Sequence, residues 1–389
     1  MIVEKAKDVL REYSLCNNCL GRLFGKLGKA TNEERGKAIK LILQMEGEEI
    51  KEGECYICGG IFEKLEEFAN LCVKVSEGIE FDTFWVGSRF PGDVLERERE
   101  IWEKFNITTG EPINREFNRE LGKVLAKKIG KLPSRENADV VFIVEPFSQK
   151  VELQVNPIFI AGRYRKLVRG IPQTPAPGFK ESVATIVCRT FKKHFGGKCI
   201  FKGAGREDVD VRTLGRGRPF VVEVKRPVRR NIDLNEVARE INSSGKVEVI
   251  ELRFIDREEA EKILTTRHKK IYEALVYVKE GVSREDVEKV VKSLTNAEIR
   301  QRTPRRVLNS RADKVRIRRV YKVEGELIDD NHFKLRLLTD GGLYIKELIS
   351  GDKGRTTPSV SEILGKEAWC EILDVLDVLE EDEDAKGNS

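Results

Sequence analysis

Two closely spaced cysteine pairs near the amino terminus constrain the fold of this chain more than any other feature. Cys16 and Cys19 form one C-x2-C pair, and Cys55 and Cys58 form a second. Four thiolates are a ligand set that tetrahedral Zn²⁺ prefers, and they would leave no open position for catalysis. We therefore predict a structural zinc in a module of residues 1–62. Unrelated buried or redox-active cysteines are the alternative.

The gap between the two pairs is long for a compact zinc ribbon, so we expect an inserted helix over Asn32–Gln44. Thr31 followed by Glu34 is a typical helix start. Eight cysteines in a cytoplasmic chain of this size argue against a disulfide framework. We expect these scattered cysteines to be core residues. They are Cys72, Cys188, Cys199 and Cys370.

Length and charge limit the classes of protein to consider. The chain has 389 residues, 35% of them charged and 40% hydrophobic, which favours a cytoplasmic protein of two or three domains with no membrane partner. The last ten residues hold five acids and one Lys, so we expect a disordered acidic tail over 377–389. The remaining basic body favours a polyanion such as nucleic acid, although solvated surface charge is the more common explanation. Nothing indicates obligate assembly, and we expect a monomer.

Residues 63–160 read as an α+β unit that could bind RNA. Strand-like runs occupy Phe81–Val86 and Val140–Val144, and a helical period covers Asn114–Ile129. The second run leads through a turn at Glu145–Lys150 into a further strand.

The composition then changes at residues 161–180, which join arginines and lysines to closely spaced prolines. Arg163 and Lys166 precede Pro172, Pro175 and Pro177. Repeated proline disfavours both helix and sheet, so we predict an extended connection between domains. A plain basic linker is the alternative to an RNA contact here.

Residues 181–376 alternate strands and helices and form the last predicted domain. The expected strands are Phe220–Val224, Val247–Phe254, Ile271–Val278, Val315–Tyr321 and Phe333–Leu338. The expected helices are Glu181–His194, Asn235–Ser243, Arg257–Leu264 and Arg284–Ser293.

Candidate chemistry concentrates in the segment Gly203–Val224. Phosphate loops, dinucleotide fingerprints and nucleophile elbows are absent from the sequence, which lowers the probability of cofactor enzymes and triad hydrolases. Asp208 and Asp210 instead lie among several arginines. Neighbouring positive charge keeps a carboxylate ionised, and an ionised carboxylate can act as a nucleophile. A salt-bridged structural loop is the alternative.

Two further segments stand out. Nine of the twenty residues at 300–319 are Lys or Arg and one is acidic, a density typical of phosphate-backbone binding, with a solvated basic strand as the alternative. Tyr344, Ile345 and Lys346 read as an apolar strand. A buried lysine there needs a carboxylate partner, whereas an edge-strand lysine would need none.

Four motifs carry a family resemblance. Arg206-Glu-Asp208 resembles the nucleophile motif of pseudouridine synthases, the segment RHKKIYEALVYV with Tyr272 is similar to their second motif, and LYIKEL with Lys346 is similar to their third. QRTPRRV followed by SRADKVRIRRV resembles a further shared segment. The string NPIFIAGRYRKLVRGIPQTP is similar to the signature of one branch, the tRNA pseudouridine synthase 10 family of archaea and eukaryotes.

The resemblance implies an α+β fold with a long mixed catalytic sheet, a THUMP-type RNA-binding domain and the zinc module. It implies an isomerase that converts uridine to pseudouridine in the T-loop of tRNA, at position 55 and in archaea also 54, without an organic cofactor. Asp208 would be the nucleophile, and the resemblance favours it over Asp210. Tyr272 would contact the base and Lys346 would keep Asp208 ionised. The remaining residues would line the base site or grip phosphates: Ile345, Leu373, Arg206, Arg212, Arg163, Lys166, Arg305 and Arg306.

Two rival classes stay open at the level of sequence. THUMP-type regions also occur in tRNA methyltransferases and thiolating enzymes, which need an adenosyl-methionine or ATP loop that this sequence does not display. A non-catalytic tRNA-binding or chaperone protein would use the same basic strips, but Asp208 would then be dispensable.

Overall fold

The computed structural model describes residues 2–309 and 311–379, and the chain divides into two compact units. The amino-terminal unit runs to Pro157 and also takes Arg226–Arg230, whereas the carboxyl-terminal unit takes 158–225 and the chain from Asn231. Most of the predicted acidic tail, 380–389, lies outside the described residues. None of the helices in the described ranges combines the length and the apolar character that a bilayer span requires.

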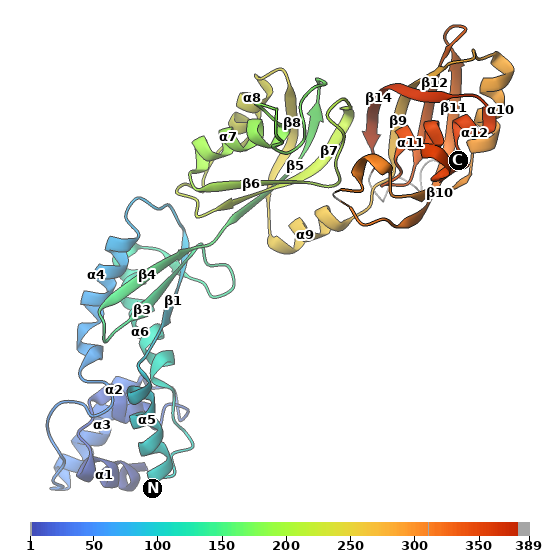
Figure 1. Ribbon diagram of the computed structural model, residues 1–389. Coiled ribbons are helices and arrows are strands. Elements are labelled where there is room, and N and C mark those ends of the chain that lie inside the picture. Colours follow the sequence, from blue (N-terminus) through green and yellow to red (C-terminus); the bar gives the residue numbers. More distant parts are fainter. Residues whose placement is uncertain (1, 310, 380–389) are drawn as a thin grey trace. The chain divides into compact units, whose positions relative to one another are not determined.

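Helices surround the four cysteines in the first part of the amino-terminal unit (Figure 1). They are α1 (Ile2–Glu12), α2 (Asn17–Arg22) and α3 (Asn32–Met45). Thr31 and Glu34 form a reciprocal capping box that starts α3, so the predicted helix and its start are confirmed. Helices α2 and α3 approach closely because both present glycine: a Cβ on Gly21 would lie 1.8 Å from the carbonyl oxygen of Asn32.

The rest of this unit packs helices against a four-stranded sheet with the order β2-β1-β3-β4. The strands are β1 (Thr83–Ser88), β2 (Leu132–Pro133), β3 (Val140–Glu145) and β4 (Lys150–Val155), and the helices are η1 (Ile61–Lys64), α4 (Leu65–Val75), α5 (Gly92–Lys104) and α6 (Ile113–Ile129). The predicted strand pair is confirmed, because β3 and β4 are antiparallel across the predicted turn. One hydrophobic core runs from Ala6 to Val144, so the cysteine region and the sheet are packed together.

A ten-stranded mixed sheet forms the carboxyl-terminal unit, with the order β13-β10-β11-β12-β9-β14-β7-β5-β8 and β6 paired to β7. Its strands are β5 (Ile158–Lys166), β6 (Lys198–Gly203), β7 (Arg212–Lys225), β8 (Val247–Ile255), β9 (Lys270–Val278), β10 (Glu298–Arg302), β11 (Val315–Leu327), β12 (His332–Thr339), β13 (Thr356–Thr357) and β14 (Ala368–Val378). Its helices are α7 (Val183–Phe195), α8 (Leu234–Asn242), α9 (Arg257–Thr265), α10 (Arg284–Leu294), α11 (Ile345–Ser350) and α12 (Val360–Leu364), with short turns η2 (Arg305–Val307) and η3 (Gly351–Gly354). The predicted strands Phe220–Val224, Val247–Phe254, Ile271–Val278, Val315–Tyr321 and Phe333–Leu338 and the four predicted helices of this region are present.

The predicted extended connection over 161–180 is wrong in its first part. Residues 161–166 belong to β5, an interior strand hydrogen-bonded to β7 on one side and β8 on the other. The prolines follow β5 in irregular chain inside the same unit. Residues of β5 are mostly buried, and this burial stabilises the strand although prolines follow it.

Two other predictions also require correction. Tyr344, Ile345 and Lys346 do not form a strand, because Tyr344 caps α11 and the other two begin that helix. Cys188 and Cys199 are not separate core cysteines but form a disulfide that joins α7 to β6. Cys72 is buried as predicted, whereas Cys370 is half-buried.

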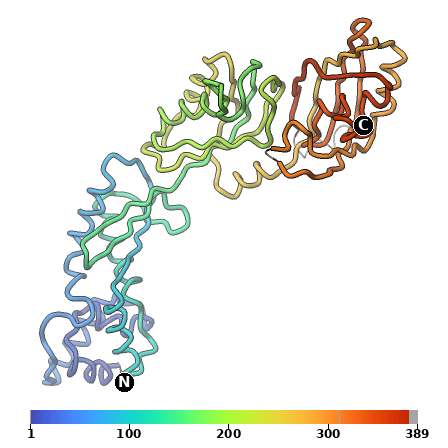
Figure 2. The backbone as a smooth tube through the Cα atoms, viewed as in Figure 1, coloured from blue at the N-terminus to red at the C-terminus, as the bar shows by residue number. Residues whose placement is uncertain are grey.

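The sheet has two hydrophobic cores, one around β9, β11, β12 and β14 and one around β5, β6, β7 and β8. These halves meet where β7 and β14 pair in parallel at only two positions, Arg212 with Asp374 and Thr213 with Val375. Figure 2 lets the backbone be followed through this junction. The segment that carries Asp208 leads directly into β7 at this place.

Candidate active site

The loop between β6 and β7 carries Asp208 and is held from beneath by a buried lysine. Lys166, which is fully buried at the end of β5, donates from Nζ to the carbonyl oxygens of Asp208 and Ile171, both at 2.9 Å. Burial lowers the pKa of Lys166. The backbone of Asp208 is thereby fixed while its side chain remains about one-third exposed.

Two cations contact the Asp208 carboxylate. Arg306 lies 3.0 Å from it, and the Nζ of Lys346 lies 3.4 Å from Oδ2. Lys346 makes a shorter contact with Asp210, at 2.8 Å to both carboxylate oxygens. Partial burial alone would raise the pKa of Asp210, but Lys346 outweighs it, so this pKa lies below its usual value. The structure therefore brings the predicted Asp208 and Lys346 together, with Asp210 as a second carboxylate for the same ammonium.

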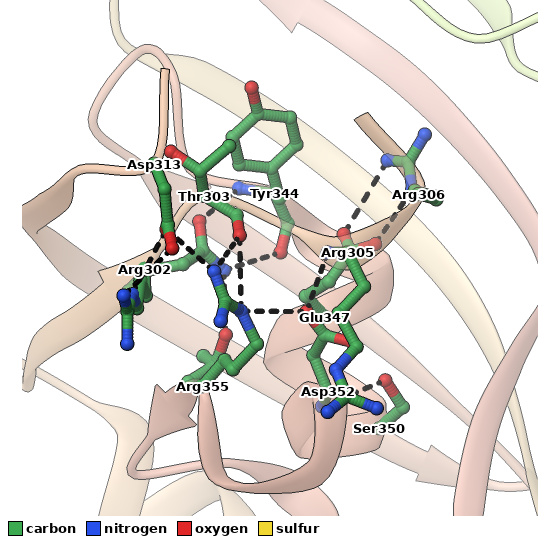
Figure 3. A network of polar contacts seen from close by, with 12 residues as sticks. Arg302, Thr303, Arg305, Arg306, Asp313, Tyr344, Glu347, Ser350, Asp352 and Arg355 are labelled. Carbon is green, nitrogen blue, oxygen red and sulfur yellow. Dashed lines mark hydrogen bonds and ion pairs between the residues drawn. The ribbon is translucent and has the colours of Figure 1, made fainter. Parts of the chain in front are cut away.

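Arg306 is itself oriented by a second acid. Its Nε donates to the buried Glu347 on α11 at 2.6 Å (Figure 3). Burial would lower the pKa of Arg306, but the carboxylates of Glu347 and Asp208 raise it. The preceding residue, Arg305, donates its backbone N–H to Asp352 at 3.0 Å. The segment after β10 is thus fixed to α11 and η3, and Arg306 is presented to Asp208.

Apolar side chains form the wall of the pocket beside Asp208. Tyr272 on β9, Ile345 on α11 and Leu373 on β14 all line it, and each is less than 10% exposed. Burial raises the pKa of Tyr272 to about 12, so its phenol is neutral at neutral pH. The pocket therefore places the Asp208 carboxylate beside an apolar wall.

The four predicted metal ligands converge in the amino-terminal unit. The sulfur atoms of Cys16, Cys19, Cys55 and Cys58 all lie within 4.8 Å of one another. Cys16 Sγ and Cys58 Sγ are 3.6 Å apart, close to the roughly 3.8 Å that tetrahedral Zn–S geometry gives. The fully buried Arg22 donates to Cys19 Sγ at 3.5 Å, which suits a cluster of thiolates. This cysteine group could hold a metal ion.

Comparison with known proteins identifies the family. The family model described as "Pus10, C-terminal" matches residues 159–380, and the model "Pus10 THUMP domain, archaeal" matches 68–145. A protein of Pyrococcus furiosus named "tRNA pseudouridine synthase Pus10" is 73% identical over 98% of this chain and 99% of its own length. The chain belongs to the Pus10 family. A Methanocaldococcus jannaschii protein of the same name is 41% identical over 95% of this chain and 93% of its own.

The fold agrees with this membership, since a Pus10 chain of this kind combines a THUMP domain with a large mixed sheet. The solved "Crystal Structure of a Cbf5-Nop10-Gar1 Complex" aligns with a TM-score of 0.31 and 17% identity, covering 56% of this chain and 58% of that chain. A similarity this low carries no argument about the site.

Three predicted phosphate-binding residues of this Pus10 chain are engaged elsewhere. Arg163 is 5% exposed and donates to the carbonyl oxygens of Gly217 and Val378, and Lys166 holds the Asp208 loop. Arg212 makes two hydrogen bonds to Asp374, at 3.1 and 2.7 Å. The expectation that Arg163 and Lys166 grip phosphates does not fit the structure, because buried side chains cannot reach a phosphate. Arg206, in contrast, is exposed at the pocket.

Sequence reasoning missed a buried network behind the loop that carries Asp208. Glu207 accepts hydrogen bonds from Tyr164 at 2.8 Å and from Arg218 at 2.8 Å. Gln173 donates to the same Tyr164 oxygen at 2.8 Å. Nothing in the sequence around Glu207 and Glu347 distinguishes them from other acidic residues. Only the tertiary fold reveals that the carboxylate of each is buried and paired with an arginine of the site.

Proposed function

We propose that this Pus10 chain isomerises uridine to pseudouridine in the T-loop of tRNA, at position 55 and also at 54, with Asp208 as the nucleophile. The observation that carries the proposal is the Asp208 carboxylate, held between Arg306 and Lys346 at the edge of an apolar pocket. Both cations lie within ion-pair distance of this carboxylate. The relatives' name, tRNA pseudouridine synthase, fits this chemistry.

The reaction needs no change of oxidation state and no added group. Asp208 attacks the target nucleotide, and the bond between N1 of uracil and the ribose breaks. The freed uracil turns within the pocket and bonds to the ribose through C5, the hydrogen on C5 leaves as a proton, N1 gains one, and Asp208 is released. The product is an isomer of the substrate. An organic cofactor therefore has no role in this proposal.

In this proposal the apolar wall forms the binding surface for the extruded base. Tyr272 would stack against the uracil, and Ile345 and Leu373 would exclude water while the base turns. Extruding a nucleotide costs a few kcal/mol, and a loop of tRNA lowers that cost because its bases are less firmly paired. Arg206 and Arg305, both exposed, would contact phosphates of the T-arm.

A structural zinc in the four-cysteine group belongs to the same proposal. Four sulfur ligands fill the tetrahedral shell, so the ion would staple α2 to the chain around Cys55 and would take no part in the reaction. The role of the amino-terminal unit would then be to present its THUMP domain to the tRNA.

Release of tritium from tRNA labelled at C5 of uridine, in the absence of a methyl donor, tests the assignment of the nucleophile, because the C5 hydrogen leaves when pseudouridine forms. We expect wild-type protein to release tritium, Asp208→Asn to release none, and both to bind the tRNA with similar affinity. Asp210→Asn is the matched control, since it removes the neighbouring carboxylate and should keep measurable release.

Release by folded Asp208→Asn would contradict the role of Asp208. No release by folded, tRNA-binding wild-type protein at its working temperature would instead support a non-catalytic tRNA-binding protein. Release that depends on added adenosyl-methionine would favour a methyltransferase.

A further inference from the structure

The basic segment at 300–319 presents its arginines on two opposite faces of the sheet. Strands β10 and β11 are antiparallel, with Arg300 paired to Ile317 and Ile299 paired to Arg318. Because side chains alternate along a strand, Arg318 shares a face with the buried Ile299, whereas Arg300 and the neighbouring Arg319 point to the exposed face. Arg316 lies two residues from Arg318 on the same side.

The arginines on the face that carries the buried Ile299, here called the inner face, lack acidic partners among the described residues. Within residues 2–309 and 311–379, no carboxylate forms an ion pair with Arg267, Arg316 or Arg318. Burial and the nearby charges of Arg267 and Arg316 lower the pKa of Arg318, and its Nε is buried without a hydrogen-bond partner among the described residues. Positive charges crowded in this way favour an anion between them.

Asp340, an acid whose charge acts on Arg318, is already engaged. Asp340 accepts hydrogen bonds from the backbone N–H of Arg319 and from the hydroxyl of Tyr321, both at 2.8 Å. The arrangement differs from that of Arg302 and Arg355, which share the carboxylate of Asp313 (Figure 3).

The inner arginines also lie beside the pocket. The guanidinium of Arg318 packs on Gly342, where an added Cβ would lie 3.5 Å from its Nε. Gly342 has a φ of 89°, which favours glycine, and the chain continues from it through Leu343 and Tyr344 into Lys346. A phosphate held by Arg318 would therefore belong to a nucleotide next to the one in the pocket.

We propose that Arg267, Arg316 and Arg318 form a phosphodiester-binding site for the RNA strand beside the target nucleotide, while Arg300 and Arg319 on the opposite face do not contact the RNA. This inference rests on the proposed function, because it takes the pocket beside Lys346 to hold the target base. The ligand is an RNA phosphate, and free inorganic phosphate is the other source of the same chemistry.

The salt dependence of tRNA binding tests the site. Each phosphate contact contributes about 0.7 to 0.9 to the slope of log affinity against log salt concentration. We expect Arg318→Gln to reduce the slope of the full-length protein by about that amount and Arg318→Lys to retain it. Arg319→Gln is the matched control, because it removes the same charge one residue away on the other face and should leave the slope unchanged.

An equal decrease in the slope of log affinity against log salt concentration in Arg318→Gln and Arg319→Gln would overturn the proposal of this site. It would indicate a general effect of net charge. An unchanged slope in Arg318→Gln would overturn the proposal as well. Millimolar inorganic phosphate at constant ionic strength should not displace the tRNA; displacement from wild type but not from Arg318→Gln would mean that a free anion, rather than the RNA strand, is the ligand. Failure of folded wild-type protein to bind tRNA at all would reject the proposed function, and the site with it.

Discussion

At the scale of single residues, the site depends on how two carboxylates share their cations. Asp208 contacts Arg306 and Lys346, and Asp210 takes the shorter contact with Lys346. Arg306 is tied to Glu347, so it has less freedom to leave Asp208 than Lys346 has. We infer that Lys346 adjusts between the two acids when the nucleotide enters.

The first prediction concerns Lys346. Lys346→Met keeps the length of the side chain but removes its charge, so Asp208 would lose one of its two cations. We expect the single-turnover rate to fall about tenfold to a hundredfold, on the order of 1.4 to 2.8 kcal/mol, with tRNA affinity changed much less. A rapid-quench assay of pseudouridine formation would measure this. An unchanged rate in the folded variant would reject the pairing role.

The second prediction concerns Lys270, a buried lysine near the site. Its Nζ would lie 3.3 Å from a Cβ on Gly205, and burial together with the charge of Arg218 lowers its pKa to about 7 although Glu207 opposes this. In the unfolded chain the pKa is about 10.4. Between these values the unfolded chain binds the proton and the folded protein does not, so the free energy of unfolding rises with pH, by up to about 1.4 kcal/mol per unit.

Urea unfolding at pH 7, 8 and 9 would measure this rise. Lys270→Met should remove that part of the slope, while substitution of the exposed Lys192 by Met should leave it in place. The same pH dependence in wild type and Lys270→Met would contradict the assignment.

At the scale of elements, local periodicity predicted most helices and strands, because their apolar residues recur with the helix or strand period. Local periodicity failed where tertiary contacts determine the secondary structure. Strand β5 forms although prolines follow it, because β7 and β8 pair with it on both sides. The residues Tyr344 to Lys346 are apolar like a strand, yet Gln301 accepts from the backbone N–H of Tyr344 and the chain turns into α11.

Tertiary contacts also limit what the sequence could predict about the candidate site. The predicted Asp208, Tyr272, Ile345, Lys346 and Leu373 meet at one pocket, and the family motifs were sufficient to find them. The separate functions of the charged residues near the site could not be predicted from the sequence. They depend on which face of a strand each residue occupies and on how deeply its side chain is buried. Arg163 and Arg318 look alike in sequence, but Arg163 binds backbone carbonyl oxygens, whereas the buried Nε of Arg318 has no hydrogen-bond partner among the described residues.

A glycine in β7 provides the prediction at this scale. Gly217 has a φ of 76°, and a Cβ there would lie 2.6 Å from the carbonyl oxygen of Tyr164 on β5. We expect Gly217→Ala to lower the free energy of unfolding by about 2 to 4 kcal/mol through strain and displacement of β5. Gly245→Ala, at a φ of 64° in open space, should cost only the strain, about 1 kcal/mol. Equal losses in denaturant unfolding would show that the contact with β5 is unimportant.

At the scale of the whole molecule, the chain consists of two units with separate hydrophobic cores. The residues proposed to carry out the reaction all belong to the carboxyl-terminal unit, and the four-cysteine group belongs to the other. Each unit can therefore be perturbed by itself.

Metal removal is the corresponding prediction. Zinc binding to such sites contributes on the order of 10 kcal/mol to folding, comparable to the stability of a whole domain. We expect a chelator, or Cys55→Ser, to unfold the amino-terminal unit at temperatures where the carboxyl-terminal unit stays folded. Cys370→Ser is the control and should leave both transitions in place. Hydrogen exchange resolved by peptide would measure each unit, and protection of α2 and α3 unchanged by chelation would contradict a structural metal.

The central claim is that Asp208 converts T-loop uridine to pseudouridine, and mapping of the product on tRNA tests it most directly. An unmodified tRNA transcript would be incubated with metal-replete wild-type protein or with Asp208→Asn, treated with carbodiimide and read by primer extension. The account predicts new stops at position 55, and also at 54, with wild-type protein alone. Stops with Asp208→Asn, or no T-loop stops with folded wild-type protein that binds the tRNA, would contradict it.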